Sequence, residues 1–402
     1  MLNISKFTKD HVIERQESLF LPDIEQNKDK LRENIQNKSV LVIGGAGSIG
    51  SSFIRAILEF EPSKLVVVDL NENGLAELTR DLRSTEGLKV PEEYLTYTLD
   101  FADPIFERIF KANGGFDIVA NFSAHKHVRS EKDKYSVEAL LKNNVLKAKG
   151  LLDLLVSYPP EHFFCVSTDK AANPVNVMGA SKRVMEDLIM AYKDDYKVTT
   201  ARFANVAFSN GSLPLSFFDR VMKHQPLVAP YDVKRYFVSL EESGQICMLA
   251  CILGKSGEVF FPKLEEAKMK TFTSICDAFL KELGYEKREC KSDAEAKKIA
   301  SEMKAGDKTY PVVYFKSDTT GEKSFEEFYV EGEPKDMDRF ESLGVILSKE
   351  HRSKSEVQNF LNKLTEIFSS PEFSKKEVVE SLKEFLPNFE HEEKGKNLDQ
   401  KM

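Results

Sequence analysis

Three glycines near the start of the chain could bring a backbone close to a phosphate. Gly44, Gly47 and Gly50 form a GxxGxxG pattern between an apolar run and a helical stretch, and Ser48 and Ile49 lie within the same turn. In a strand–turn–helix, such glycines permit the tight turn, admit a pyrophosphate to the backbone N–H groups and let the helix pack close to the strand. A glycine-rich turn can also be an ordinary strand–helix connection.

An aspartate 19 residues after Gly50 favours a dinucleotide site. Asp69 ends the second apolar run, where a carboxylate can bind both hydroxyls of an adenosine ribose. It would repel a 2′-phosphate and no arginine follows it directly, so the pattern predicts NAD rather than NADP. Asp100 and Phe101 follow the third apolar run and either touch the adenine or cap the strand end. Ser123, after the fourth run, is a further candidate for cofactor contact.

A second group of residues could transfer protons. Thr168, Asp169 and Lys170 follow the fifth apolar run. Met178, which cannot accept a proton, and Lys182 lie four residues apart at the start of the next helical stretch. An adjacent acid and amine can donate and accept protons on neighbouring atoms when their surroundings tune their pKa values. The same two residues can also form an ion pair at the end of a strand.

The elements that must position these residues alternate between short strands and amphipathic helices. This alternation predicts an α/β Rossmann fold, a doubly wound parallel sheet. Fully apolar runs such as 65–68 fit a sheet that is covered on both faces. We expect the longest helices at 137–156 and 177–192. The expected strands are Val40–Ile43, Leu65–Val68, Tyr94–Leu99, Ile118–Phe122, Phe163–Val166 and Val198–Arg202.

The chain divides into four predicted segments. Residues 1–38 form a helical N-terminal extension and residues 39–205 the NAD-binding Rossmann domain. Residues 206–345 form a smaller substrate domain, in which 286–309, rich in Lys, Glu and Ala, indicates a solvated helical insertion. Residues 346–402 form a helical tail, and its charged end is predicted to be disordered.

Seven stretches between residues 39 and 330 follow the order of a known family. They are GGAGSIG (44–50), AHKHV (124–128), NNVL (143–146), STDKAANPVNVMGASKR (167–183), ARFANVAFSNGS (201–212), KRYFVSLEE (234–242) and GEKSFEEF (321–328). In these stretches the chain resembles the extended short-chain dehydrogenase/reductases and, more narrowly, the UDP-N-acetylglucosamine 4,6-dehydratases of bacterial polysaccharide biosynthesis. The superfamily usually has a tyrosine at the place of Met178, and one branch of these dehydratases has methionine there.

The resemblance implies a reaction with recycled NAD. A hydride leaves sugar C4, a base removes the C5 proton, an acid protonates the C6 hydroxyl so that water leaves, and the hydride returns to C6. By resemblance, Asp169 is the acid and Lys170 the base, Thr168 hydrogen-bonds O4, and Lys182 holds the nicotinamide ribose. The third segment would bind the UDP-sugar, with Arg235 as the candidate for the diphosphate. The residues that match substrate positions of the family are Lys126, Asn205, Ser209, Asn210, Arg235 and Glu242.

Departures from the family pattern leave the sugar and the nucleotide open. They are the altered stretch 121–128, Thr319-Thr320 in place of the usual Arg-Pro, and the insertion at 286–309. Arg202 could contact the substrate or pair with a structural carboxylate. A nucleotide-sugar 4-epimerase or a 5-epimerising dehydratase on the same scaffold is the alternative function, and a non-catalytic NAD-binding protein is another. An Asp169–Lys170 pair favours elimination, because epimerisation at C4 needs no base at C5.

Composition excludes other classes of protein. The 402 residues include 57 Lys and Arg against 65 Asp and Glu, a formal net charge of −8, which argues against nucleic acid as a partner. The sequence contains no run of about 18 apolar residues, so we predict no membrane-spanning helix. The five cysteines form no CxxC pair and are expected in the core of a cytoplasmic protein. We expect no metal, and we expect a homo-oligomer.

Overall fold

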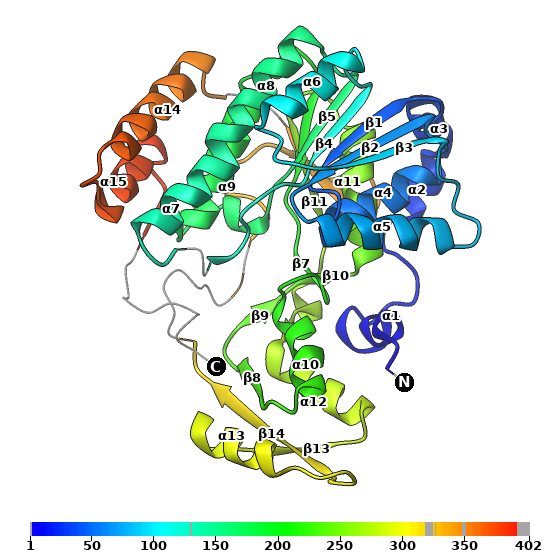
Figure 1. The fold of residues 1–402 in the computed structure, drawn as a ribbon, viewed down its shortest axis with the longest axis vertical. Helices are drawn as coiled ribbons and strands as arrows, with labels where there is room; N and C mark the ends of the chain where they lie inside the picture. Colours follow the sequence, from blue (N-terminus) through cyan, green and yellow to red (C-terminus); the bar gives the residue numbers. More distant parts are fainter. Residues whose placement is uncertain (1, 129–130, 318–324, 326, 348–350, 392–402) are drawn as a thin grey trace.

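A nine-stranded sheet forms the centre of the molecule (Figure 1). The computed structural model describes residues 2–128, 131–317, 325, 327–347 and 351–391. The strands from β11 to β3 run parallel, and β16 and β15 add an antiparallel edge. From edge to edge they are β15 (Lys335–Asp336), β16 (Leu343–Ile346), β11 (Glu258–Pro262), β6 (Val198–Ala201), β5 (His162–Val166), β4 (Ile118–Asn121), β1 (Ser39–Ile43), β2 (Lys64–Asp69) and β3 (Glu93–Thr98). The predicted doubly wound Rossmann fold is confirmed.

The order of the strands creates a ligand crevice. Strand β1 lies between β2 and β4, so the chain leaves it toward opposite edges of the sheet. In open α/β sheets, ligands bind at such a reversal, outside the carboxyl ends of the strands. Each of the six predicted strands lies within one residue of the observed one, because short apolar runs between turn residues are a strong local signal.

Helices cover both faces of the sheet, which explains why β1, β4 and β5 carry almost no polar side chains (Figure 1). One face carries α4 (Ser48–Leu58), α5 (Glu72–Ser84) and α11 (Leu240–Leu253). The other face carries α6 (Pro104–Ala112), α7 (Lys134–Leu141), α8 (Lys147–Ser157) and α9 (Val177–Met190). Helix α7 passes into α8 through one π-helical turn, η3 (Lys142–Leu146), so the predicted helix at 137–156 has an irregular centre.

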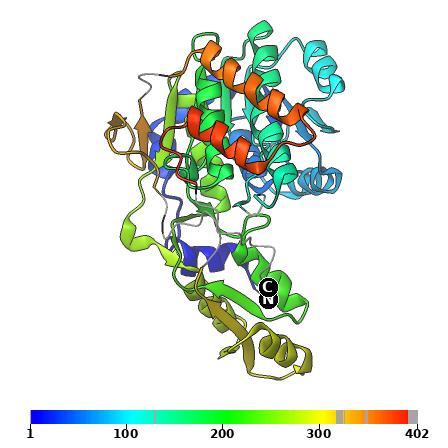
Figure 2. The same ribbon diagram turned by 90° about the vertical axis from the view of Figure 1, so that its left-hand side faces the viewer.

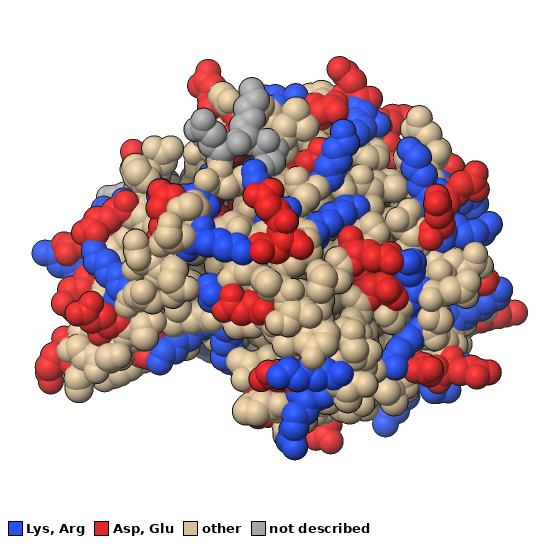
Figure 3. Space-filling view, turned by 90° about the horizontal axis from the view of Figure 1, so that it is seen from above, with Lys and Arg blue, Asp and Glu red and all other residues tan. Residues whose placement is uncertain are grey.

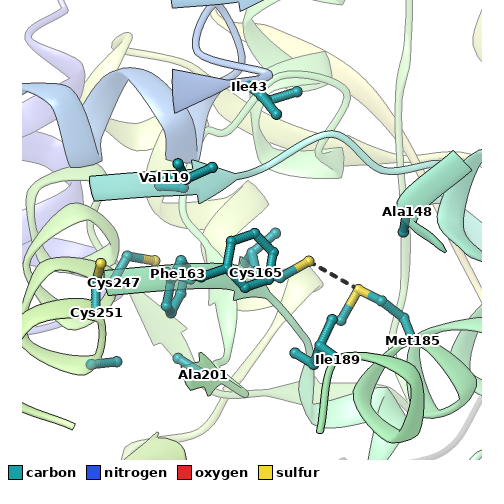
Figure 4. Close-up of a cluster of buried hydrophobic side chains, with 14 of the residues drawn as sticks. Ile43, Val119, Ala148, Phe163, Cys165, Met185, Ile189, Ala201, Cys247 and Cys251 are labelled. Carbon is teal, nitrogen blue, oxygen red and sulfur yellow. Dashed lines mark hydrogen bonds between the residues drawn. The ribbon is translucent and has the colours of Figure 1, made fainter. Parts of the chain in front are cut away.

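The core on both sides of β5 contains sulfur-bearing side chains (Figure 4). Cys165 on β5 points toward α9, and its Sγ lies 3.2 Å from Met185 Sδ. Cys247 and Cys251 lie one turn apart on α11. All five cysteines are free thiols, and all are buried as predicted. Burial raises the pKa of Cys165 to about 11, so this thiol stays protonated and packs as an apolar group.

A smaller lobe lies beyond the carboxyl ends of the strands (Figures 1 and 2). Its sheet consists of β13 (Glu286–Glu289), β14 (Thr309–Phe315) and β8 (Leu227–Pro230), and its helices are α10 (Leu213–Met222), α12 (Phe272–Glu282) and α13 (Asp293–Glu302). The short pairs β7 (Asn205–Val206) with β10 (Phe237–Val238) and β9 (Lys234–Arg235) with β12 (Lys270–Thr271) connect the lobes. The predicted segment 206–345 therefore supplies strands to both lobes, and the insertion 286–309 folds as a strand and a helix rather than as a helix alone.

The N-terminal segment joins the two lobes. Its helical turns α1 (Ile4–Phe7) and η1 (Thr8–Val12) place Phe7 and Val12 in the apolar core of the smaller lobe. Helices α2 (Leu21–Gln26) and α3 (Lys28–Ile35) lie against the large lobe. The buried carboxylate of Asp23 accepts the N–H groups of Glu341 at 2.6 Å and Ser342 at 2.9 Å, just before β16.

Two C-terminal helices, α14 (Lys354–Ser369) and α15 (Lys375–Phe385), pack as a hairpin beside α7 and α9 (Figures 1 and 2). The predicted disordered end of the tail lies outside the described residues. On the face of the large lobe in Figure 3, positive and negative side chains are interspersed, and neither sign forms a large patch. Within the described ranges, no helix combines the length and the apolar character needed to cross a bilayer.

Candidate functional site

The glycine turn after β1 has no room for side chains at two of its positions. Gly44 has φ +76°, and a Cβ there would lie 2.7 Å from the backbone nitrogen of Ser123. A Cβ at Gly50 would lie 2.4 Å from the carbonyl oxygen of Gly44. A Cβ at Gly47 would contact only the carbonyl oxygen of Gly44, at 3.3 Å. Close packing within the protein therefore does not account for a glycine at this position. Gly47 is also the N-cap of α4 and offers no side-chain acceptor to the first N–H groups of the helix.

A cavity of about 250 Å³ lies between this turn and the ends of β2, β3 and β4. The predicted cofactor residues that line it are Gly44, Gly47, Ser48, Ile49, Gly50, Asp69, Asp100, Phe101 and Ser123. The carboxylate of Asp69 accepts the N–H group of Ala46 at 3.0 Å and that of Asn71 at 2.9 Å, which fixes it beside the turn. Lys182, the remaining predicted cofactor residue, does not line this cavity.

The carboxylate of Asp100 is held at the rim of the cavity. It accepts the N–H group of Ala102 at 2.9 Å and pairs with Lys147 on α8. Burial works to raise the pKa of Asp100, but the hydrogen bonds from Lys147 and Ala102 outweigh it and hold the pKa below its usual value. Asp100 therefore stays charged at neutral pH and ties β3 to α8.

Two predicted substrate residues meet at the opposite wall. Lys126 lines the cavity, and its Nζ donates to the carbonyl oxygen of Asn210 at 3.0 Å. The N–H group of Asn210 donates to the hydroxyl of Ser48 at 2.8 Å, so the loop at 209–212 closes over the glycine turn. Burial lowers the pKa of Lys126.

Asn144, the second residue of the NNVL stretch, is not among the predicted site residues. Its side chain accepts from the N–H group of His125 at 2.8 Å and donates to the hydroxyl of Ser181 at 3.0 Å. It thus joins the loop 124–128 to α9. No sequence pattern marks Asn144, but in the structure it lies in the π-helical turn η3, and such turns are frequent at functional sites.

The proposed proton-transfer residues form one cluster at the carboxyl end of β5. Asp169 begins the short 3₁₀ helix η4 (Asp169–Ala171), and its Oδ1 accepts three hydrogen bonds. The donors are the Thr168 hydroxyl at 2.7 Å, the Lys170 N–H group at 2.9 Å and Lys170 Nζ at 3.0 Å. The side chain of Asp169 is 3% exposed and that of Lys170 is 17% exposed, so the pair is largely shielded from solvent rather than on an open surface.

Helix α9 packs tightly against this cluster. A Cβ at Gly179 would lie 2.6 Å from the carbonyl oxygen of Lys170, which explains the glycine directly after Met178. Met178 lies on the first turn of α9 and is buried. Lys182, one turn later, donates to the carbonyl oxygen of Val166 at 2.7 Å. Burial lowers the pKa of Lys182, which is the direction expected for an amine removed from water.

Three other predicted substrate residues lie between the lobes. Asn205 is on β7, and its Nδ2 is a buried donor without a hydrogen-bond acceptor in the described part of the chain. Ser209 is buried in the loop that follows. Arg235 is buried on β9, and its Nη1 donates to the carbonyl oxygen of Lys234 at 2.9 Å. An orphaned buried donor is costly in protein folding, so Asn205 indicates a ligand at this place.

Glu242 and Arg202 have structural partners instead. The fully buried carboxylate of Glu242 caps α11 and accepts Nε and Nη2 of Arg15 at 2.6 and 2.7 Å. Arg202 is 1% exposed and pairs with Glu186 at 2.7 Å and Glu333 at 3.2 Å. These contacts agree with the interpretation that Arg202 pairs with structural carboxylates rather than with the substrate. Sequence reasoning missed Arg15 and Glu186, because nothing local relates them to their partners.

The sheet order, the glycine turn and the cluster after β5 define the chain as an extended short-chain dehydrogenase/reductase. A family model described as "Polysaccharide biosynthesis protein" matches residues 40–333, and the chain belongs to this family. The matched range includes the stretch 321–328, of which only residues 325, 327 and 328 lie among the described residues. The resemblance inferred from the sequence is therefore confirmed at the level of the family.

Curated relatives span more than one activity. An "Uncharacterized membrane protein" of Methanocaldococcus jannaschii is 30% identical over 77% of this chain and 86% of its own length. A "UDP-N-acetylglucosamine 4,6-dehydratase (inverting)" of Campylobacter jejuni is 25% identical over 73% of this chain and 82% of its own length. A "UDP-glucose 4-epimerase" of Rickettsia canadensis is 27% identical over 56% of this chain and 66% of its own length. The chain is thus related to enzymes that modify nucleotide sugars.

A solved structure has the same fold. The dTDP-glucose 4,6-dehydratase DesIV of Streptomyces venezuelae, solved as a double mutant with NAD and DAU bound, gives a TM-score of 0.55 at 19% identity. The match covers 79% of this chain and 94% of that chain.

Proposed function

We propose that the protein is an NAD-dependent 4,6-dehydratase of a UDP-N-acetylhexosamine, with UDP-N-acetylglucosamine as the expected substrate. The observation that carries the proposal is the Thr168–Asp169–Lys170 cluster at the end of β5, where an acid and an amine lie 3.0 Å apart. Dehydration at C5 and C6 needs a base and an acid on neighbouring atoms, and this cluster supplies both. The relationship to a UDP-N-acetylglucosamine 4,6-dehydratase supports the same reaction.

The residues around the glycine turn fit NAD. The backbone at Gly47 leaves space for a pyrophosphate at the start of α4, and Asp69 offers its carboxylate to a ribose. Asp69 would repel a 2′-phosphate, which favours NAD over NADP. When bound, NAD supplies the hydride acceptor and donor that oxidation at C4 and reduction at C6 require.

The Asp169–Lys170 contact places the proposed acid and the proposed base side by side. A base must be a neutral amine, and an acid must be a protonated carboxyl group. The neutral amine of Lys170 removes the C5 proton, and the carboxyl group of Asp169 protonates the departing C6 oxygen. Thr168 hydrogen-bonds O4 of the sugar, and Lys182 orients the nicotinamide ribose.

Residues between the lobes hold the sugar nucleotide in this proposal. Arg235 binds the diphosphate, because a guanidinium can contact two phosphate oxygens at once. Asn205 donates its unpaired Nδ2 hydrogen bond to the substrate, and Ser209, Asn210 and Lys126 complete the wall. Glu242 is not part of this proposal, because both of its oxygens already accept hydrogen bonds from Arg15 and backbone N–H groups.

One experiment separates dehydration from the alternative. The purified protein with NAD and UDP-N-acetylglucosamine in D₂O should form a product that has lost one water and carries deuterium at C5. A C4 epimer of unchanged mass would instead support an epimerase, an activity that the relationship to UDP-glucose 4-epimerases keeps as the second candidate. NAD binding without any product, over a panel of UDP- and dTDP-sugars, would contradict both.

A further inference from the structure

A buried carboxylate beside α9 has no role in the reaction proposed above. Glu131 lies after the loop 124–128 and just before α7, and its side chain is 3% exposed. Its Oε2 accepts the N–H group of Val177, the first residue of α9, at 2.7 Å. The N-cap residue Asn176 accepts the N–H group of Gly179 at 2.8 Å, so the two side chains share the free donors of the first turn. Met178 lies between these donors.

Residues from the C-terminal part of the chain fix the other oxygen of Glu131. Lys375 on α15 places Nζ 3.2 Å from Oε1, and His391 donates to the same oxygen through Nε2. Both partners are 19% exposed or less. Burial works to raise the pKa of Glu131, but the hydrogen bonds from His391 and Val177 outweigh it and hold the pKa below its usual value. A charged carboxylate at a helix N-terminus is also favoured by the helix dipole.

The C-terminal hairpin contacts the neighbouring helices on both sides of this carboxylate. Lys134, at the start of α7, donates to the carbonyl oxygen of Pro371 at 3.0 Å, and its Nζ lies 4.9 Å from the ring centre of Phe373. Near the other end of α9, Arg352 lies 3.7 Å from Asp187. Figures 1 and 2 show α14 and α15 running alongside α7 and α9. The C-terminal segment 352–391 therefore reaches both ends of α9, through Glu131 at the first turn and through Asp187 near the last.

We infer that Glu131 is a positioning residue for the catalytic helix, and that Lys375 and His391 of the C-terminal segment hold it in place. Through Val177, this carboxylate fixes the first turn of α9, which carries Met178 and leads to Lys182. The inference rests on the proposed function only in naming these two residues as parts of the active site. It gives the C-terminal segment, which lies away from the crevice, an influence on the site through Glu131 and α9.

Hydrogen–deuterium exchange tests the positioning role without any substrate. Loss of a hydrogen bond to a charged group should speed amide exchange at the start of α9 by about tenfold or more in Glu131→Gln. The same change should weaken NAD binding, measured by calorimetry, since Lys182 follows one turn later. Lys375→Met should act in the same direction, and Lys375→Arg should restore slow exchange. The variant with both Glu131→Gln and Lys375→Met should exchange no faster than Glu131→Gln alone, because both changes remove one interaction.

The matched control is Lys363→Met, which removes an exposed ion pair with Glu384 in the same hairpin. It should leave exchange in α9 and NAD affinity unchanged. The inference is overturned if Glu131→Gln leaves exchange at 177–182 within twofold of the unmodified protein. It is equally overturned if exchange rises by one common factor over the whole chain, which would mean general destabilisation. Absence of dehydration in the unmodified protein would refute the proposed function but not these two readouts.

Discussion

The neighbouring strands β5 and β6 are both followed by charged residues, but these residues differ in how far they are exposed. After β5, Lys170 reaches Asp169 at 3.0 Å, and its side chain remains 17% exposed. After β6, Arg202 is 1% exposed and contacts the carboxylates of Glu186 and Glu333. A charge at the end of a strand is therefore ambiguous in a sequence. The exposure of its side chain separates a group that can exchange protons from one that stabilises the fold.

Breaking the pair after β5 should have the largest effect. Lys170→Ala should lower turnover by about 10²- to 10⁴-fold and abolish deuterium incorporation at C5, because no base reaches that carbon. Asp169→Asn should stop the loss of water but spare some exchange at C5. Mass spectrometry and NMR of the product measure both outcomes. If both variants turn over at near-normal rates while binding NAD, the pair is structural and the contrast with Arg202 disappears.

Breaking the pair after β6 should instead destabilise the fold. Arg202→Met leaves Glu186 buried with the Ser167 hydroxyl and Arg183 Nη1, 3.8 Å away, as partners, and should cost about 3–5 kcal/mol in the free energy of unfolding in urea. The control Arg55→Met removes an exposed ion pair with Asp81 and should cost less than about 1 kcal/mol. A higher KM for the UDP-sugar without loss of stability would instead assign Arg202 to the substrate.

His162, at the amino end of β5, should make the stability of the folded protein depend on pH. Burial and the nearby Lys197 lower the pKa of His162 to about 4, and its Nδ1 accepts a hydrogen bond from Lys197 Nζ at 2.9 Å. An unfolded histidine has a pKa of about 6.5, so below that value the unfolded state binds more protons. The folded protein should therefore lose up to about 3 kcal/mol of stability as the pH falls from 6.5 to 4. The loss should be smaller in His162→Gln, and equal slopes in the two proteins over this range would contradict the prediction.

The smallest effect is expected at Met178. Its buried side chain cannot transfer a proton, so only its shape should matter. Met178→Leu conserves volume and should keep turnover within about tenfold of the unmodified protein. Steady-state kinetics with saturating NAD measures this. A fall by several orders of magnitude with NAD still bound would show that the sulfur contributes to the reaction.

Local patterns in the sequence predicted the strands of the sheet and the glycine turn. They did not predict the contacts between residues that lie far apart in the chain. The six strands and the residues lining the cavity follow from short apolar runs and from glycines within a few residues of each other. By contrast, Arg15 meets Glu242 across 227 positions and His391 meets Glu131 across 260. No local pattern relates such partners. Strand β16 likewise joins the large sheet only because the chain returns to β11 after building the smaller lobe.

The N-terminal segment that joins the lobes also has a consequence for the order of synthesis. The carbonyl oxygen of Leu19 accepts the hydroxyl of Ser342, which lies 323 positions later in the chain. At about 5–20 residues per second, the ribosome adds that partner roughly 16 to 65 s after Leu19. During this interval the apolar side chains of Phe7, Val12 and Phe20 emerge without the core that later covers them. During synthesis, the first helices of this protein therefore expose apolar side chains. A chaperone that binds short apolar segments would bind the growing chain there.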